Sequence, residues 1–433
     1  MNKVLVISYY WPPSGGAGVQ RWLKFVKYLR DFGWEPVVYT PENPESPETD
    51  ESLFRDIPEN LQIIRRPIWE PYNLYKQFIG KGKQEKIQVA FLTEKKRNPL
   101  IESLSVWIRG NFFIPDARKF WIRPSRKFLK HYLAKNPVDL IISTGPPHSM
   151  HLIAKEVAEF TSLPWIADFR DPWTHIDFYK DLMLTSYADR KHHKQELEVL
   201  KKASAIITIS SSMAGEFDNL YHRHYDVITN GYDEDDIVHG ILQPDDKFSI
   251  AHIGTLVGTR NPVILWEAIR AILEQDSDFR EDLVIKLVGR IDFSVNNSIE
   301  QHGLSEYVER IDYMPHAVVV KVQQQSQVLL LLINNTHNAK GILTGKFFEY
   351  LAVRRPILCI GPPDGDAAAI LKETNSGLIS NFNDLQKTKE NILIYYQLFK
   401  EGKLISSSHN IEKYSRKCLT EKLSEVMNRV IKK

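Results

Sequence analysis

Short runs of consecutive apolar residues recur along the chain, and longer amphipathic stretches separate them. Continuous apolar character, rather than strict alternation, is typical of strands that are covered on both faces of a sheet. Strands that alternate with helical stretches favour a parallel α/β sheet. The predicted strands are Val4–Ser8, Pro36–Tyr39, Gln62–Ile64, Asp139–Ser143, Trp165–Asp168, Ala205–Ile209, Val227–Thr229, Phe248–Ile253, Val284–Val288, Val328–Ile333, Pro356–Ile360 and Gly377–Ile379.

This pattern restarts near residue 247, after an acidic stretch, Tyr232–Lys247, that is typical of a linker. We therefore predict an α/β fold with two Rossmann-like parallel-sheet domains, at 1–240 and 241–409, that face each other across a cleft. The remaining residues, 410–433, predict an amphipathic helix that packs back on the N-terminal domain.

Composition narrows the class of protein. With 43% hydrophobic and 25% charged residues, a chain of 433 residues can bury large cores and needs no disulfide or metal for stability. The two cysteines, Cys359 and Cys418, favour a reducing compartment. A net charge of +2 gives no indication of nucleic acid as a partner. The longest aliphatic run, Val328–Ile333, is far shorter than the about 20 residues of a membrane span. We expect a cytoplasmic protein.

One stretch, 94–137, is rich in basic and aromatic residues and poor in acids. One interpretation is a surface for an anionic membrane or a phosphate-bearing acceptor, which would place the protein peripherally at the inner face of the cell membrane. The other is a solvated helical insertion with some buried aromatic side chains.

Two glycine-rich turns each follow the first strand of a domain and lead into a helix. In the first, Gly15 and Gly16 would let backbone amides approach a phosphate or a sugar, and the helix N-terminus adds a favourable dipole. In the second, Gly254 and Thr255 precede Arg260, whose guanidinium can bind a diphosphate through charge-assisted hydrogen bonds. The alternatives are a tight turn and a surface arginine near a helix N-cap.

A third motif, Gly341–Ala352, lies between two predicted strands of the second domain. Its helix opens at Thr344, so Lys346 and Glu349 lie one turn apart on the same face. A carboxylate there can accept hydrogen bonds from ribose hydroxyls, although a surface ion pair is the simpler alternative. We predict a donor-binding site that also includes Leu343.

Polar residues follow two strands of the first domain, where α/β folds bind ligands. Asp168 ends one strand and His148 follows another; with Arg260, they are the candidate catalytic residues. The residues after Asp168 are candidates for binding the acceptor: Arg170, Asp171 and Trp173. An internal Asp–Arg pair and a structural histidine are the alternatives. No histidine pair at metal-ligand spacing is accompanied by an acidic partner, so we expect neither a metal nor any other cofactor.

These motifs resemble the retaining glycosyltransferases of family 4, which have the GT-B fold. The resemblance rests on the first glycine-rich turn, on the Gly-x5-Arg turn at Gly254, and on Lys-Phe-Phe-Glu-Tyr-Leu-Ala-x3-Pro from Lys346. It covers nearly the whole chain. The segment Asp168–Trp173 is similar to a bacterial branch of the family that is often found in polysaccharide gene clusters.

The resemblance implies transfer of a sugar, with retention and without a bound metal, from a nucleoside-diphosphate sugar to a glycan, a lipid-linked molecule or another cell-envelope acceptor. It implies that Arg260 contacts the donor diphosphate and Glu349 the ribose. It also implies that Gly15 and Gly16 are the family's N-terminal glycines, and that its active-site histidine or acid is His148 or Asp168.

Two positions depart from the family. Thr255 stands where the family usually has arginine, and Gly341 stands at the first glutamate of its Glu-x7-Glu motif, which usually contacts the transferred sugar. Lys346 is a candidate replacement for the missing polarity. The departures keep two alternatives open: a catalytically weakened nucleotide-sugar-binding subunit, and a GT-B-fold sugar-nucleotide epimerase or hydrolase.

Overall fold

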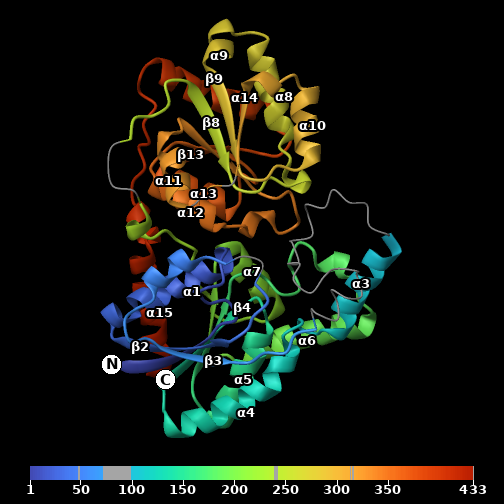
Figure 1. Cartoon of the computed structure of the whole chain (residues 1–433), viewed down its shortest axis with the longest axis vertical. Coiled ribbons are helices and arrows are strands. Elements are labelled where there is room, and N and C mark those ends of the chain that lie inside the picture. The colour runs from blue at the N-terminus through green and yellow to red at the C-terminus, as the bar shows by residue number, and fades with distance from the viewer. Residues whose placement is uncertain (47–48, 72–98, 238–241, 313, 315, 433) are drawn as a thin grey trace. The chain divides into compact units, whose positions relative to one another are not determined.

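The computed structural model describes residues 1–46, 49–71, 99–237, 242–312, 314 and 316–432. The chain forms two compact units: unit 1 contains Met1–Thr229 with Arg416–Lys433, and unit 2 contains Asn230–Ser415 (Figure 1). Each unit is a parallel sheet covered by helices on both faces. Within the part of the chain that the structure describes, every helix is too short or too polar to cross a membrane.

The sheet of unit 1 has the strand order β3-β2-β1-β4-β5-β6-β7, and all its neighbouring strands are parallel. Strand order reverses between β1 and β4, and parallel α/β sheets bind ligands beside such a switch point. The strands are β1 Asn2–Ile7, β2 Trp34–Pro41, β3 Gln62–Arg66, β4 Leu140–Gly145, β5 Trp165–Phe169, β6 Ala205–Thr208 and β7 Asp226–Val227.

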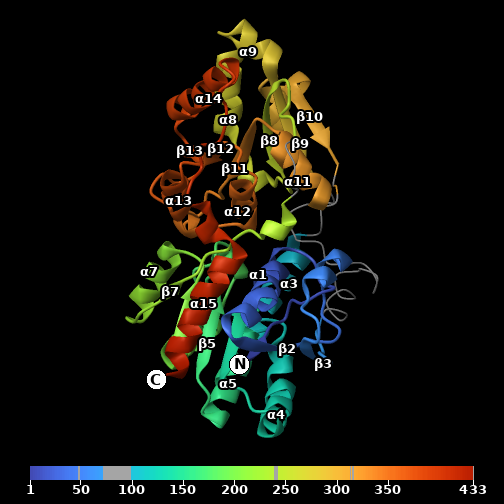
Figure 2. The same cartoon turned by 90° about the vertical axis from the view of Figure 1, so that its left-hand side faces the viewer.

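Two hydrophobic clusters cover opposite faces of this sheet. Along β1, Val4 and Val6 face one cluster, which contains residues of α1 and α15, whereas Leu5 and Ile7 face the other, which contains residues of α4 and α5. Figure 2 shows α1 and α15 side by side. The helices are α1 Ala17–Tyr28, α3 Pro99–Phe112, α4 Lys119–Lys135, α5 Ser149–Thr161, α6 Ser186–Lys202, α7 Ser211–Leu220 and α15 Arg416–Ile431.

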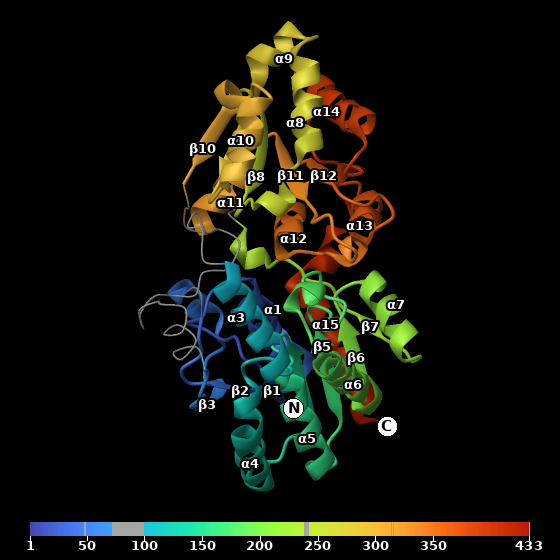
Figure 3. The same ribbon diagram turned by 90° about the vertical axis from the view of Figure 1, so that its right-hand side faces the viewer.

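The sheet of unit 2 repeats this design with the order β10-β9-β8-β11-β12-β13 (Figure 3). Its strands are β8 Phe248–Ile253, β9 Leu283–Val288, β10 Val308–Ile311, β11 Val328–Leu332, β12 Ile357–Ile360 and β13 Gly377–Ser380. Its helices are α8 Val263–Leu273, α9 Ser277–Asp282, α10 Phe293–Gln301, α11 His316–Gln325, α12 Gly345–Ala352, α13 Asp366–Thr374 and α14 Leu385–Lys400. Single 3₁₀ turns include η3 Tyr179–Leu182, η5 Gly258–Arg260, η7 Ala339–Gly341 and η8 Ile411–Tyr414.

All twelve predicted strands are present, with boundaries that move by at most a few residues. The sequence missed β10, because this edge strand is only partly buried and its residues do not form an apolar run. The C-terminal helix packs on α1 of unit 1, as predicted, but it begins at Arg416 rather than near residue 410. The residues before it form η8, and Ser415 bridges to Tyr232.

Candidate functional site

In unit 2, a lysine lies directly over the glycine that ends the first strand. Gly254 follows β8 with φ +108°, a left-handed conformation that favours glycine. A Cβ on Gly254 would lie 2.8 Å from Nζ of Lys346, in the first turn of α12. Gly289, after β9, also has φ +108° and packs on the Gly254 backbone. The close approach of two strand ends leaves room for the ammonium group only because residue 254 lacks a side chain.

The predicted phosphate-binding arginine is held by a residue that the sequence analysis did not single out. Arg260 lies in η5, and its Nε donates a hydrogen bond of 2.5 Å to Oδ1 of Asn334, which follows β11. This bond ties one edge of the guanidinium and fixes its orientation. Asn334 is the first of two consecutive asparagines after a buried strand, which is the only signal that could have found it.

Lys346 lies among charges of both signs. Burial, and after it the charge of Arg260, lower the pKa of its ammonium to about 8, although Glu349 acts in the opposite direction. Two cations and one carboxylate therefore meet at the carboxyl edge of the sheet. Because the cations outnumber the carboxylate, the site is suited to an anion.

A buried histidine lies beneath these cations. His252, in β8, is 2% exposed, and its Nδ1 is 3.3 Å from the carbonyl oxygen of Leu330. Its Nε2 is buried without a hydrogen-bond partner. Burial, together with Lys346 and Arg260, lowers the pKa of His252 well below its ordinary value, so the ring stays neutral. His252 could not be singled out from the sequence, because a histidine inside a strand belongs to no recognisable motif.

The other predicted donor-binding residues differ in exposure. Thr255 is exposed, and Thr344 precedes α12 without capping it through its side chain. Leu343 has a buried side chain, and its carbonyl oxygen accepts a hydrogen bond from Asn230. Leu343 can therefore offer a ligand only backbone atoms. Gly341, which ends η7, has no side chain with which to contact a sugar.

In unit 1, the predicted residues follow β1, β4 and β5, which are neighbours in the sheet. Gly15 is buried, and Gly16 is the exposed N-cap of α1 with φ +88°. The first turn of α1 carries no acidic residue, so its N-terminal dipole is not opposed there.

Asp168 is fully buried and its carboxylate already has several partners. It accepts hydrogen bonds from Nε and Nη2 of Arg21, from Nε1 of Trp22 and from Oγ1 of Thr144. Burial would raise the pKa of Asp168, but Arg21 and these hydrogen bonds outweigh burial and keep it below its ordinary value. Arg21 in turn donates to the carbonyl oxygens of Ile228 and Thr229. The carboxylate thus joins α1, β4, β5 and the segment after β7.

The candidate acceptor-binding residues have three different environments. Arg170 is 9% exposed and donates to the carbonyl oxygens of Gly18 and Pro146, so it ties the first turn of α1 to the loop after β4. Asp171 is exposed. Trp173 is buried, and its Nε1 donates to Nδ1 of His192. Of these three, Asp171 is the exposed side chain, although burial by its neighbours raises the pKa of its carboxyl group and the charge of Arg170 lowers it.

His148 stacks on Trp173, with ring centroids 4.6 Å apart and ring planes inclined by 3°. Burial lowers the pKa of His148 well below its ordinary value, and His151, Arg170 and His192 lower it further. The pKa of His151 is lowered to about 3, mainly by burial. Both rings are therefore neutral, and His148 can act as a hydrogen-bond donor or acceptor without carrying charge.

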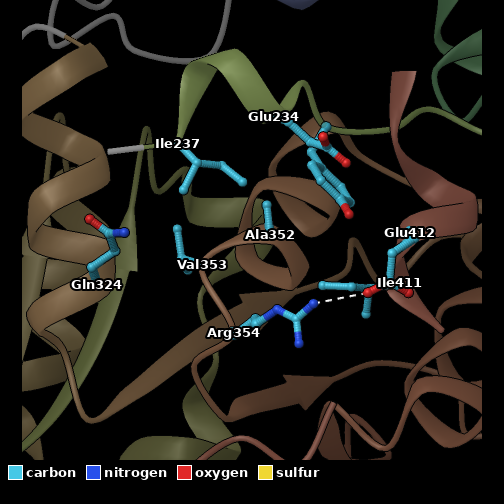
Figure 4. A pocket seen from close by; sticks show the side chains of 9 residues that line it. Glu234, Ile237, Gln324, Ala352, Val353, Arg354, Ile411 and Glu412 are labelled. Atoms are coloured by element: carbon cyan, nitrogen blue, oxygen red, sulfur yellow. Dashed lines mark hydrogen bonds and ion pairs between the residues drawn. The ribbon is translucent and has the colours of Figure 1, made fainter. Parts of the chain in front are cut away.

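A hollow of about 370 Å³ lies elsewhere in unit 2, and none of the predicted site residues lines it (Figure 4). Arg354 and Glu412 form an ion pair of 2.9 Å at its wall. Its lining residues are Tyr232, Glu234, Ile237, Gln324, Ala352, Val353, Arg354, Ile411 and Glu412.

The basic and aromatic stretch, 94–137, is described from residue 99 onward, so Lys95, Lys96 and Arg97 lie outside the described residues. The described part forms α3 and α4. Among the described residues, no three histidine, cysteine, aspartate or glutamate side chains are grouped so that they could hold a metal ion.

Comparison with solved structures found proteins that match over nearly the entire chain. Sucrose-phosphate synthase from Thermosynechococcus elongatus matches with a TM-score of 0.61 and 11% sequence identity, over 100% of both chains. Anabaena Alr3699/HepE, solved in complex with UDP-glucose, has a TM-score of 0.59 and 12% identity, over 99% of this chain and 100% of the other. WaaG, a glycosyltransferase involved in lipopolysaccharide biosynthesis, has a TM-score of 0.55 and 12% identity, over 98% of this chain and 99% of the other.

A scan of protein-family models and a search of curated protein sequences found no match to the chain. The structural similarities show the fold: the chain has the GT-B fold, built from two Rossmann-like parallel-sheet domains.

Proposed function

We propose that this protein is a metal-independent, retaining glycosyltransferase of the family 4 type. It transfers a sugar from a nucleoside-diphosphate sugar to a glycan, a lipid-linked molecule or another cell-envelope acceptor, in the cytoplasm and at the inner face of the cell membrane. Unit 2 binds the nucleotide and unit 1 binds the acceptor. The donors to test first are UDP-sugars, because UDP-glucose is bound in a protein of the same fold.

One observation carries the proposal: two cations lie together at the carboxyl edge of the unit 2 sheet, beside a strand end that has no side chain of its own at Gly254. Arg260 is oriented by Asn334, and Lys346 lies over Gly254. Rossmann-like domains bind phosphates at this edge of the sheet, near the N-terminal ends of the helices that follow the strands. Lys346 supplies a second positive charge, which offsets the absence of a cationic side chain at Thr255.

The chemistry of transfer explains why two cations are needed. As the bond from sugar to phosphate breaks, the sugar becomes oxocarbenium-like and negative charge builds on the leaving diphosphate. Arg260 and Lys346 stabilise that charge from fixed positions. The leaving phosphate itself takes the proton of the attacking acceptor hydroxyl. Glu349 accepts hydrogen bonds from the ribose hydroxyls.

In unit 1, His148 hydrogen-bonds the substrate as a neutral imidazole, and Asp171 contacts the acceptor. We assign Asp168 as a positioning residue, because its carboxylate is already committed to Arg21, Trp22 and Thr144. Arg170 likewise positions the first turn of α1 and the loop after β4. These four residues then divide into two that touch substrate and two that hold the backbone around it.

The proposal is tested by turnover of purified protein with a panel of nucleotide sugars, with release of the nucleoside diphosphate as the readout. Arg260→Ala should lower turnover by about two to three orders of magnitude, as the loss of a group that stabilises the transition state typically does. The matched control is Arg280→Ala, an arginine of the same unit in α9. Equal turnover in wild type and Arg260→Ala would remove Arg260 from the mechanism.

A second candidate is a nucleotide-sugar-binding subunit with weakened catalysis. Gly341 and Thr255 favour it, because each lacks the charged side chain that the family usually has there. A subunit of this kind would bind a nucleoside diphosphate with no turnover of any donor. A GT-B-fold epimerase or hydrolase would instead convert or hydrolyse the donor at a rate that no acceptor increases.

A further inference from the structure

Exposed aromatic rings lie in contact with one another at the start of α4. Trp69, just after β3, packs edge-on against Phe120 with ring centroids 4.9 Å apart, and Phe120 contacts Phe113 at 6.1 Å. Lys119 lies over both phenylalanine rings and donates a hydrogen bond to the carbonyl oxygen of Phe112. We call these five residues the aromatic surface. Trp69 and Phe120, whose rings are in contact, are 57% and 40% exposed, and Phe112, whose ring contacts Trp107, is 59% exposed; large exposed rings of this kind mark a candidate interaction surface.

The outer face of α4 continues this surface with basic residues. Its exposed positions largely follow the helical period: Phe120, Arg123, Pro124, Lys127, His131, Ala134 and Lys135. The helix, Lys119–Lys135, contains six lysines and arginines and no aspartate or glutamate. Three of these basic residues are exposed, Arg123, Lys127 and Lys135, whereas Arg126 is paired with Glu156; the exposed face is therefore a cationic stripe, with an aromatic ring at its N-terminal end.

The inner face of α4 packs against the rest of unit 1. Trp121 is 1% exposed, stacks on Tyr39 at 4.9 Å and donates a hydrogen bond to the carbonyl oxygen of Pro67. Leu129 and Leu133 are buried in the same cluster. Because packing fixes the helix, its exposed side chains are presented on a rigid support.

We propose that the aromatic surface and the cationic stripe of α4 are the place where the protein docks on an anionic lipid bilayer. Aromatic rings favour the boundary between headgroups and acyl chains, while lysine and arginine bind anionic headgroups. A second copy of the chain is a poor fit, because two such faces would bring like charges together. The inference deepens the proposed function, since it names the partner that would present a lipid-linked acceptor.

Co-sedimentation of the whole protein with vesicles tests this inference without any nucleotide sugar. The protein should pellet with vesicles of phosphatidylcholine and phosphatidylglycerol at low salt, be released at high salt, and stay in solution with phosphatidylcholine alone. Absence of pelleting at low salt, or equal pelleting with both vesicles, would overturn the inference.

Two double variants locate the surface. Phe112→Ser/Phe120→Ser should weaken vesicle binding by about tenfold or more, because it removes two rings from the lipid interface. The control is Phe293→Ser, which changes a ring that is 71% exposed on α10 of unit 2.

Arg123→Glu/Lys127→Glu should abolish vesicle binding, whereas Lys372→Glu/Lys422→Glu, with the same change in net charge, should keep it.

The variants alter exposed side chains, so thermal unfolding should change little and a loss of binding reports the surface itself. Equal binding of the surface variants and their controls would overturn the inference. A surface variant that instead converts a dimer to a monomer in light scattering would also overturn it, in favour of self-association. Nucleotide binding, measured separately on the same preparations, distinguishes a failure of this inference from a failure of the proposed function.

Discussion

At the residue scale, two aspartates three positions apart have opposite surroundings. Asp168 is fully buried and forms an ion pair of 2.8 Å with Arg21, which is itself 1% exposed. Asp171 is exposed. Breaking a buried ion pair is costly because the remaining charge stays buried without its partner.

Asp168→Asn should therefore lower the free energy of unfolding by about 3–5 kcal/mol, because it leaves Arg21 buried without a countercharge. Asp171→Asn should change it by less than about 0.5 kcal/mol, as exposed substitutions usually do. Chemical denaturation of both variants measures the difference. If Asp168→Asn left stability unchanged and abolished turnover, Asp168 would act in the chemistry rather than in the fold.

Lys346 gives the donor site a defined pH dependence. Its pKa in the protein without ligand is lowered to about 8, and a bound diphosphate favours the protonated form. Affinity for the diphosphate should be constant below about pH 8 and fall above it, by up to about tenfold for each pH unit, because binding must then take up a proton. Calorimetric titration at a series of pH values on both sides of pH 8 measures this change in affinity.

In Lys346→Met the affinity for the diphosphate should be low at every pH, and its decrease above pH 8 should disappear. In Lys346→Arg the affinity for the diphosphate should stay constant across the same pH range, because arginine keeps its charge there. If the affinity still fell above pH 8 in both variants, another group would be titrating and the assigned role of Lys346 would be wrong.

At the element scale, the strand-to-helix turn after β8 depends on one glycine. Gly254→Ala should displace the lysine side chain, since the new Cβ would lie 2.8 Å from Nζ of Lys346. Gly303→Ala is the matched control, because Gly303 also has a positive φ, of +69°, but a Cβ there would meet nothing within 4 Å. Both substitutions should cost about 1–2 kcal/mol of stability from backbone strain.

Only Gly254→Ala should weaken binding of a nucleoside diphosphate, because only there does the new methyl group compete with the lysine. Thermal unfolding and calorimetric titration of the two variants separate strain from loss of the site. Equal nucleotide affinity in the two variants would contradict the proposed position of Lys346 in the site.

Elements were more predictable than the contacts between them. The strands could be predicted because continuous apolar runs mark strands buried on both faces. The glycine turns and the helix that carries Lys346 and Glu349 could be predicted because they depend on residues close in sequence. Asn334 and Arg21 could not, since they meet their partners, Arg260 and Asp168, across 74 and 147 positions of chain.

Residues with uncommon environments were also hard to assign from sequence. Trp173 follows a strand at the edge where ligands bind, but its ring packs inward on His148, and the pattern of residues contains no signal for that direction. His252 lies within a strand, where only its burial between cations distinguishes it. In such cases the side-chain direction is set by tertiary packing rather than by local sequence.

At the scale of the whole molecule, the chain contains the same design twice. Each unit is a parallel sheet whose strand order reverses between its first and fourth strands, and each presents polar residues at its carboxyl edge. In unit 2 these residues are the cations Arg260 and Lys346; in unit 1 they are the neutral His148 and the exposed Asp171. This difference in charge is the physical basis for assigning the nucleotide to unit 2 and the acceptor to unit 1.

The most direct test is thermal unfolding of wild type and Arg260→Ala in the presence of UDP, GDP, ADP or CDP. We predict that one of these nucleotides raises the Tm of the wild type by about 2–4 °C at a concentration near 100 times its Kd, and that the variant loses this stabilisation. The account would be contradicted if none of them stabilised the wild type, or if the variant responded as the wild type does.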